Sequence, residues 1–126
     1  MFLIHSLHHA SYLVSDLEQA TNFYHQLLGL PILERPNLGY PGLWLQLSEH
    51  QQLHLMQLPN PDAGNERPLH GGRDRHIALH VSGLAELEAR LQAADIAYSL
   101  SRSGRQALFC RDPDGNALEF IEVGTG

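Results

Sequence analysis

The sequence has little of what a cross-linked, membrane-spanning or secreted protein needs. It has one cysteine, Cys110, so no disulfide can form within the chain, which agrees with a reducing compartment. No apolar run approaches the roughly eighteen residues that would cross a bilayer. The start of the chain, Met1–His5, is too short for the apolar part of a secretory leader. We therefore expect a cytoplasmic protein with no membrane partner.

Positive charge is also scarce. Eight Lys and Arg residues stand against fourteen Asp and Glu, which gives a formal net charge of -6 and no basic surface for a phosphate backbone. We expect no nucleic-acid partner. The chain has 126 residues, of which 43% are hydrophobic and 17% are charged, as in an ordinary folded protein of one domain. What the sequence does have is nine histidines.

The histidines belong to an internal repeat. His9 and His76 lie 67 residues apart, and the same spacing relates Val14 to Val81. Toward the end of each half, a Gln-Leu-His-Leu segment that contains His54 corresponds to an Ala-Leu-Glu-Phe segment that contains Glu119. Self-similarity of this kind predicts two related modules. We place them at about 5–58 and 75–124, joined by a Pro- and Gly-rich linker at about 59–74, within a single domain 1–126.

Each module is predicted to run strand, helix, strand, strand, strand. In the first, Ser15 and Glu18 form a capping box, apolar residues recur at helical spacing to Leu28, and Gly29 ends the helix. In the second, the Asp-Pro-Asp-Gly-Asn segment 112–116 predicts a structural turn before the last strand. The predicted strands are 8–14, 32–35, 43–47, 52–58, 75–81, 96–102, 105–111 and 117–123, and the predicted helices are 16–28 and about 84–94.

Alternation along these strands assigns side chains to faces. Successive residues of a strand point to opposite sides, so the leucine-rich face of each sheet lies under the helix. His9, His54, His76 and Glu119 fall on the opposite face of their strands. A pseudo-two-fold relation between the modules would then place His9 opposite His76 and His54 opposite Glu119.

These four residues are candidate metal ligands. Neutral imidazoles and a carboxylate suit borderline divalent ions, and two histidines with one carboxylate is also the ligand set of non-haem Fe(II) sites. We predict a site for one divalent ion (Zn, Ni, Co, Mn or Fe(II)) with His9, His76 and Glu119 as ligands. His54 is either a fourth ligand or a hydrogen-bonding residue behind the ligands. For each histidine taken alone, the alternative is a solvated or hydrogen-bonded surface side chain.

His80, Trp44, Phe109 and one arginine of the segment 70–75 are further candidates for substrate contact. His80 shares the face of His76, and the aromatic side chains of Trp44 and Phe109 would line an apolar pocket or belong to the core. Arg73 or Arg75, in the His-Gly-Gly-Arg-Asp-Arg segment 70–75, would meet an anionic group of the substrate or remain solvated.

At this point the chain resembles the vicinal oxygen chelate superfamily, which includes glyoxalase I, fosfomycin-resistance thiol transferases, extradiol dioxygenases and bleomycin-binding proteins. The resemblance covers nearly the whole chain. It depends on three segments: 8–30 with its His-His-Ala-Ser-Tyr-Leu-Val-Ser-Asp-Leu start, Arg75–Val81, and 112–120. It implies an α+β fold of two βαβββ modules that form an open, barrel-like cup around a divalent metal, completed across a homodimer.

Position by position, the resemblance matches His9 and His76 to the two histidine ligands and Glu119 to the carboxylate ligand. His54 stands where glyoxalase I has a glutamate, which leaves Glu119 as the one matched carboxylate base. The segment 101–105 lacks the acidic, serine-rich potassium loop of the fosfomycin transferases, and bleomycin-binding relatives usually lack the metal triad. The chain is most similar to glyoxalase-like proteins of a single domain.

The sequence and its resemblance to this superfamily leave three functions open. The first is a metal-dependent lyase or isomerase in which the metal chelates two neighbouring substrate oxygens and Glu119 acts as the base. The second is an Fe(II) dioxygenase of the extradiol type. The third is a protein that binds or sequesters a small molecule without catalysis, as resistance proteins do.

Overall fold

The computed structural model describes residues 1–101 and 103–124. Its chain divides into two compact units, Met1–Pro61 and Asp62–Gly126. Each unit contains one four-stranded mixed sheet and the helix that follows its first strand, so the predicted α+β class and the two βαβββ modules are confirmed. That both units belong to one domain stays a prediction. In the part of the chain that the structure describes, no helix has the length and apolar character to cross a membrane.

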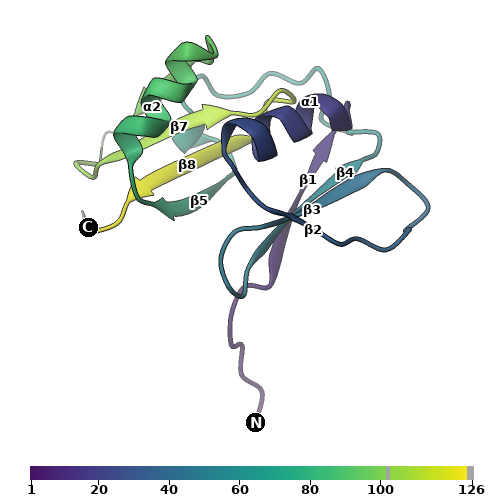
Figure 1. The fold of residues 1–126 in the computed structure, drawn as a ribbon. Coiled ribbons are helices and arrows are strands. Elements are labelled where there is room, and N and C mark those ends of the chain that lie inside the picture. Colours follow the sequence, from purple (N-terminus) through teal and green to yellow (C-terminus); the bar gives the residue numbers. More distant parts are fainter. Residues whose placement is uncertain (102, 125–126) are drawn as a thin grey trace. The chain divides into compact units, whose positions relative to one another are not determined.

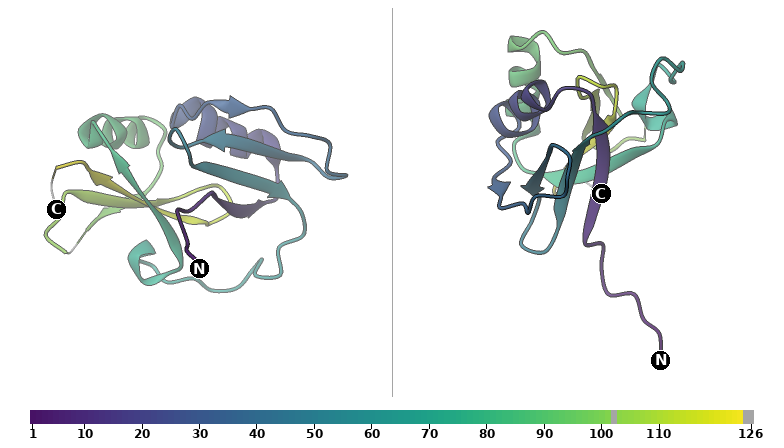
Figure 2. Two further views of the ribbon diagram at one scale, coloured as in Figure 1. Left: turned by 90° about the horizontal axis from the view of Figure 1, so that it is seen from below. Right: turned by 90° about the vertical axis from the view of Figure 1, so that its right-hand side faces the viewer.

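The sheet of the first unit has the strand order β1-β4-β3-β2, with β1 parallel to β4 and the other neighbours antiparallel. Figure 2 shows its helix lying against one face of this sheet. The helix α1 contacts β3 and β4, which bury Leu45, Leu53 and Leu55. The leucine face therefore carries the core, as predicted. The elements are β1 (His9–Val14), α1 (Leu17–Thr21), η1 (Asn22–Leu27), β2 (Ile32–Leu33), β3 (Gly42–Gln46) and β4 (Gln52–Gln57).

The first helix begins one residue later than its sequence suggests. Asp16, with an extended backbone, is the N-cap, and its Oδ1 accepts hydrogen bonds from the backbone N–H groups of Glu18 and Gln19. The predicted capping box with Ser15 at this position is wrong. Aspartate caps as well as serine does, and its negative charge also favours the positive end of the helix dipole.

The second half of this helix is wider than an α-helix. From Asn22 the backbone adopts π geometry, in which the N–H of Leu28 donates to the carbonyl of Phe23, five residues earlier. Gly29 follows with φ +79°, a conformation that glycine adopts without steric cost. The helix therefore ends where the sequence predicts, and it brings Phe23 and the fully buried Tyr24 onto the sheet.

The second unit repeats this topology with the strand order β5-β8-β7-β6. Its helix lies over the sheet, as Figure 1 shows, and buries Leu91 completely. The predicted turn at 112–116 is present: Asp112 accepts hydrogen bonds from the backbone of Asp114 and Asn116, and Gly115 has φ +85°. The elements are η2 (Gly71–Arg73), β5 (His76–Val81), α2 (Leu84–Ala93), β6 (Tyr98–Leu100), β7 (Ala107–Arg111) and β8 (Ala117–Glu122). Arg102, the last residue of the predicted strand 96–102, lies outside the described residues.

The face of β8 away from the helix is not open. Ala117, Glu119 and Ile121 are as buried as Leu118 and Phe120 on the helix side. The linker covers part of this face, since η2 packs against β7 and β8 and a Cβ on Gly71 would lie 3.5 Å from the Cβ of Ala117. The linker is thus partly ordered as a short 3-10 helix, and it forms one wall around Glu119.

Candidate metal and substrate site

His76 and Glu119 form a pair in the second unit. Parallel pairing of β5 with β8 sets Ala78 opposite Glu119, so the side chains of His76 and Glu119 emerge on the same face, on neighbouring strands. The Nε2 atom of His76 lies 3.2 Å from Oε1 of Glu119, whose side chain is only 4% exposed. A carboxylate this buried needs a cationic or hydrogen-bonding neighbour.

The other nitrogen of His76 fixes the state of the ring. Its Nδ1 lies 2.8 Å from the backbone carbonyl oxygen of Asp74, and a carbonyl can only accept, so Nδ1 donates. The neutral imidazole then carries its lone pair on Nε2, facing the carboxylate of Glu119. Two acceptors at 3.2 Å need a cation between them, either a proton or a metal ion.

The spacing of this pair fits a metal ion. With ligand bonds of about 2.0–2.2 Å and angles of roughly 90–110° at the ion, two adjacent ligands of one divalent ion lie roughly 2.8–3.6 Å apart. The observed N···O distance of 3.2 Å falls in this range. His76 and Glu119 therefore fit as two neighbouring ligands of one divalent ion.

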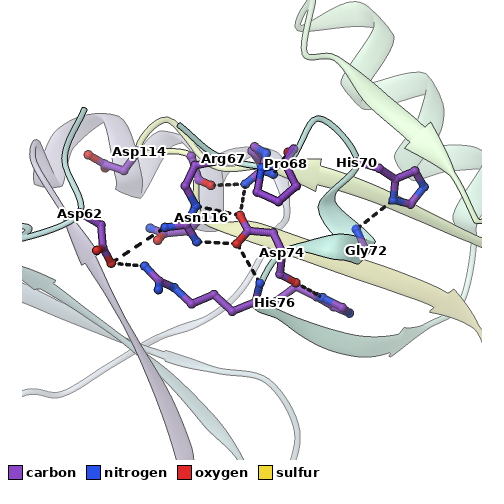
Figure 3. Close-up of polar contacts among 12 residues, drawn as sticks. Asp62, Arg67, Pro68, His70, Gly72, Asp74, His76, Asp114 and Asn116 are labelled. Atoms are coloured by element: carbon purple, nitrogen blue, oxygen red, sulfur yellow. Dashed lines mark hydrogen bonds and ion pairs between the residues drawn. The ribbon is translucent and has the colours of Figure 1, made fainter. Parts of the chain in front are cut away.

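A cluster of ion pairs anchors the backbone behind His76. The Asp74 carboxylate accepts hydrogen bonds from Arg67 (2.6 and 3.0 Å) and from Arg111 (2.8 Å), as Figure 3 shows for the labelled members of the cluster. The hydrogen bonds from Arg67, followed by those from Arg111, hold the pKa of Asp74 well below its usual range. Arg75 pairs with Asp62 in the same cluster. Arg75, one of two arginines considered for substrate contact, is thus engaged in the linker.

The first unit presents three stacked rings. The His54 ring lies between those of His9 (centroids 4.0 Å apart, 17° between planes) and Trp44 (4.4 Å, 10°). Strand pairing produces this stack, because Trp44 is the direct partner of His54 across β3 and β4. Burial, followed by the nearby charges of His9, His8 and Arg35, lowers the pKa of His54 to about 4. His54 is therefore neutral at pH 7, the state in which imidazole binds metals.

The stack limits how His9 and His54 can act together. Imidazole lone pairs lie in the ring plane, so two parallel rings 4.0 Å apart do not aim their lone pairs at one point. His54 also has its Nε2 2.8 Å from Oε1 of Gln52. His9, by contrast, is exposed, and its Nδ1 lies 2.8 Å from Nδ1 of His8. Joint binding of one ion requires the exposed His9 ring to turn out of the stack.

Within each unit, and counting only the described residues, no group of three or more His, Cys, Asp or Glu side chains gathers closely enough to hold a metal ion. The predicted ligands form two pairs, one in each unit. His9 and His54 are in contact in the first, and His76 and Glu119 in the second. The complete ligand set remains a prediction.

A cavity of about 720 Å³ opens beside His76 and Glu119 in the second unit. Two of the predicted substrate-contact residues, Arg73 and Phe109, lie in its wall. His80 is exposed and is not part of the lining, and Trp44 belongs to the ring stack of the first unit. The remaining lining residues are Pro68, Leu69, His70, Gly72, Ser99, Ser101, Ser103 and Arg105.

Sequence reasoning missed Arg105. Its Nη2 lies 3.4 Å from Oε2 of Glu119, so the carboxylate stands between His76 and a guanidinium. The predicted strand 105–111 contains part of the missing signal, because Arg105 has the same parity as Phe109, the direct strand partner of Glu119. In the structure Arg105 lies in the bend before β7, so its contact with Glu119 also depends on how this bend folds.

Comparison with known proteins assigns this architecture to a family. Residues 6–120 match the model of the Glyoxalase/Bleomycin resistance protein/Dioxygenase superfamily. The chain is 30% identical to Glyoxylase I 4 of Arabidopsis thaliana, across 91% of its own length and 69% of the relative's. It is 28% identical to the glutathione transferase FosA of Serratia marcescens, across 98% of the chain and 84% of that relative.

Solved structures show the same fold. TnmS3, an antibiotic-binding protein from a Streptomyces species, superposes with a TM-score of 0.73 at 23% identity, covering 97% of this chain and 98% of that one. Its fold is thus shared along nearly the full length of both proteins. A likeness at this identity establishes the fold alone.

Proposed function

The chain belongs to the Glyoxalase/Bleomycin resistance protein/Dioxygenase superfamily, and from that premise we propose that it is a metal-dependent lyase or isomerase of the glyoxalase type. The proposed ligands of one divalent ion are His9, His76 and Glu119, with His54 as a fourth ligand or a supporting residue. The proposed substrate is a small molecule with two neighbouring oxygen atoms. The metal, when bound, would act as a Lewis acid toward both oxygens.

One observation supports this proposal above the others. The Nε2 atom of His76 faces the Glu119 carboxylate at 3.2 Å, with Nδ1 already engaged by a carbonyl. A partly exposed imidazole and a buried carboxylate held in this way supply two ligands of a cation site, and they line a cavity of a size suited to a small ligand. The relatives named as a glyoxalase and a glutathione transferase agree with an enzyme of this kind.

The chain's own residues supply the remaining functions. Glu119 is the one carboxylate among the described residues of the cavity wall, so we assign it the role of the base that accepts a proton from the substrate. Phe109, 7% exposed, provides an apolar surface beside it. We retain Arg73 in the wall, and His80 and Trp44 on their strands, as the other proposed substrate contacts.

Metal content tests the site directly. Protein prepared without a histidine tag is expected to hold one divalent ion per chain, measured by elemental analysis after dialysis. His76→Ala and Glu119→Gln should each lose it. The matched control is His50→Ala, which removes an exposed histidine that, among the described residues, pairs with Glu49 alone. Full metal occupancy in His76→Ala would contradict the proposed site.

An Fe(II) dioxygenase is the second candidate. The ligand set of two histidines and one carboxylate is that of non-haem iron sites, and the family's description includes dioxygenases. Anaerobic loading with Fe(II), followed by addition of catechol and measurement of oxygen uptake, separates it from the lyase. Uptake proportional to the catechol consumed would support the dioxygenase and contradict a lyase that needs no oxygen.

Binding without catalysis is the third candidate, and TnmS3 is an antibiotic-binding protein of the same fold. In that case a chelator should leave ligand affinity unchanged. A metal-dependent enzyme should instead lose ligand binding when the ion is removed, and calorimetry with and without the chelator distinguishes the two.

We also propose that the protein is a cytoplasmic homodimer. The arm before β1, drawn out from the sheet of its own unit in Figure 2, exposes the large apolar side chains of Phe2, Leu3, Ile4 and Leu7. Exposed apolar side chains gathered in this way are typical of surfaces that a partner covers. Sedimentation should give twice the chain mass, and loss of the dimer on deletion of residues 1–7 would connect the arm to it.

A further inference from the structure

We propose that the substrate is an anion, with a carboxylate group beside its chelating oxygens, and that Arg105 together with Arg73 binds this group. The inference rests on the proposed function, because it concerns the cavity next to His76 and Glu119. It narrows the substrate class from small oxygenated molecules to small oxygenated acids.

The charge of the cavity differs from that of the chain. The protein as a whole has a formal charge of -6, yet the described residues of the cavity wall include two guanidinium groups and one carboxylate. A divalent ion bound to Glu119 would add further positive charge. A ligand that carries negative charge would compensate this positive charge, in a space that partly excludes water.

Arg105 has hydrogen-bonding capacity left over. Its Nε donates to Oγ of Ser103 at 3.1 Å, and its Nη2 lies 3.4 Å from Oε2 of Glu119. A strong guanidinium–carboxylate hydrogen bond is about 2.7–2.9 Å long, so the contact with Glu119 is loose. The structure shows no other side-chain contact for Arg105 among the described residues. The planar guanidinium, 42% exposed, can therefore present a pair of donors to an oxyanion in the cavity.

Arg73 lies in the same wall, and no described residue forms an ion pair with it. Its neighbours in the linker and turn, Arg67, Arg75 and Arg111, all pair with Asp62 or Asp74. In the described part of the chain, no acidic side chain or carbonyl accepts a hydrogen bond from the Arg73 guanidinium. The acidic residues of the linker thus neutralise the arginines around Arg73 and leave its charge available at the cavity.

Neutral donors complete this side of the cavity. The hydroxyl groups of Ser99, Ser101 and Ser103 line it together with Arg105. The Oγ of Ser103 already pairs with Oγ of Ser101 at 2.8 Å and accepts from the backbone N–H and Nε of Arg105, whereas Ser101 accepts from the backbone N–H of Ser103 and keeps one further site to offer. The hydroxyl of Ser101, beside a guanidinium, can serve a remaining oxygen of a carboxylate.

The test compares two chelating probes that differ by one carboxylate. Catechol and 3,4-dihydroxybenzoate carry the same neighbouring oxygens, and their dissociation constants are measured by calorimetry on the full, zinc-loaded protein. The wild-type protein should bind 3,4-dihydroxybenzoate at least about tenfold more tightly than catechol, since a charge-assisted contact that is partly exposed contributes this much. Arg105→Gln should remove most of this preference and Arg73→Gln part of it, while catechol affinity changes little.

Arg90→Gln is the matched control, because it removes one arginine charge from α2, where Arg90 pairs with the exposed Glu86. It should keep the full preference. Arg105→Lys, which retains the charge without the planar pair of donors, should give an intermediate value. Zinc content and melting temperature verify that each variant is folded and loaded.

The outcomes separate this inference from the proposed function. If neither probe binds the zinc-loaded protein, chelation at this site and the anion site are both overturned. If both probes bind with equal affinity, the proposed function stands and the anion site is overturned. If Arg105→Gln binds zinc more weakly but keeps the preference once it is loaded, Arg105 only positions Glu119, which also overturns the inference.

Discussion

The imidazole of His76 is held from behind by the backbone of Asp74, whose carbonyl oxygen accepts a hydrogen bond of 2.8 Å from Nδ1. This contact selects the tautomer that points the Nε2 lone pair at Glu119. The Asp74 carboxylate makes separate contacts, because it accepts hydrogen bonds from Arg67 and Arg111. The direction of a candidate ligand thus depends on an ion-pair cluster that lies outside the cavity.

The first prediction concerns this cluster. Asp74→Ala should lower the free energy of unfolding by about 2–3 kcal/mol, because it leaves two partly buried guanidiniums without their carboxylate. It should also lower zinc affinity about tenfold, since the backbone that orients His76 loses its anchor. Urea unfolding of the zinc-free protein and competition with a coloured chelator measure the two effects separately.

Glu86→Ala is the control for this prediction. It removes a carboxylate from the exposed pair with Arg90, and such pairs contribute little to stability. Both its stability and its zinc affinity should match the wild type. A destabilised Asp74→Ala protein with unchanged zinc affinity would show that the cluster supports the fold and not the orientation of His76.

The second prediction uses the single tryptophan of the chain. Trp44 stacks on His54, which stacks on His9, and joint binding of zinc by His9 and His54 requires the His9 ring to turn. Addition of zinc should therefore change the emission of Trp44, and the change should saturate at one ion per chain. His54→Ala should abolish the response, while His50→Ala should keep it.

An unchanged emission spectrum in protein that has bound zinc would contradict this prediction. It would mean that the stack stays intact on metal binding and that His9 is not a ligand together with His54. The same experiment therefore decides between the two roles left open for His54.

Strand alternation made much of the site predictable. The period of two placed His54 on the face opposite Leu53 and Leu55, and the strand register adds that Trp44 and Phe109 are the direct partners of His54 and Glu119. Both helices and the turn at 112–116 also lie where their sequence patterns predict. These features are local, so the residues that cause them are neighbours in the sequence.

The rest depends on contacts between distant segments. Arg105 precedes β7 by two residues, and its relation to Glu119 arises only when β7 and β8 pair. The burial of Glu119 needs the linker to fold back over β8, which no periodicity in 59–74 indicates. The shift of the helix cap from Ser15 to Asp16 has another cause: both residue types are good caps, and the choice between them depends on which backbone is extended.

The third prediction concerns Cys110, which is 3% exposed in β7. Burial, with a smaller contribution from Asp112, raises the pKa of its thiol to about 12. The thiolate is the reactive form, so the folded protein should resist iodoacetamide at pH 8 and react readily once unfolded in urea. Rapid alkylation of the folded protein, measured by mass spectrometry, would contradict the burial of this side chain.

The same thiol predicts how stability changes at alkaline pH. In the unfolded chain Cys110 loses its proton above about pH 9, while in the folded protein it keeps its proton until the pH approaches about 12. The unfolded state therefore binds fewer protons between these values, and the free energy of unfolding should fall with a slope of roughly 1.4 kcal/mol per pH unit from this group alone. Cys110→Ala removes the group, so the difference in stability between the variant and the wild type should be constant below pH 9 and should shift in favour of the variant above it. Urea unfolding of both proteins from pH 7 to pH 10.5 measures this difference, and parallel curves over the whole range would show that the thiol ionises as readily in the folded state as in the unfolded chain.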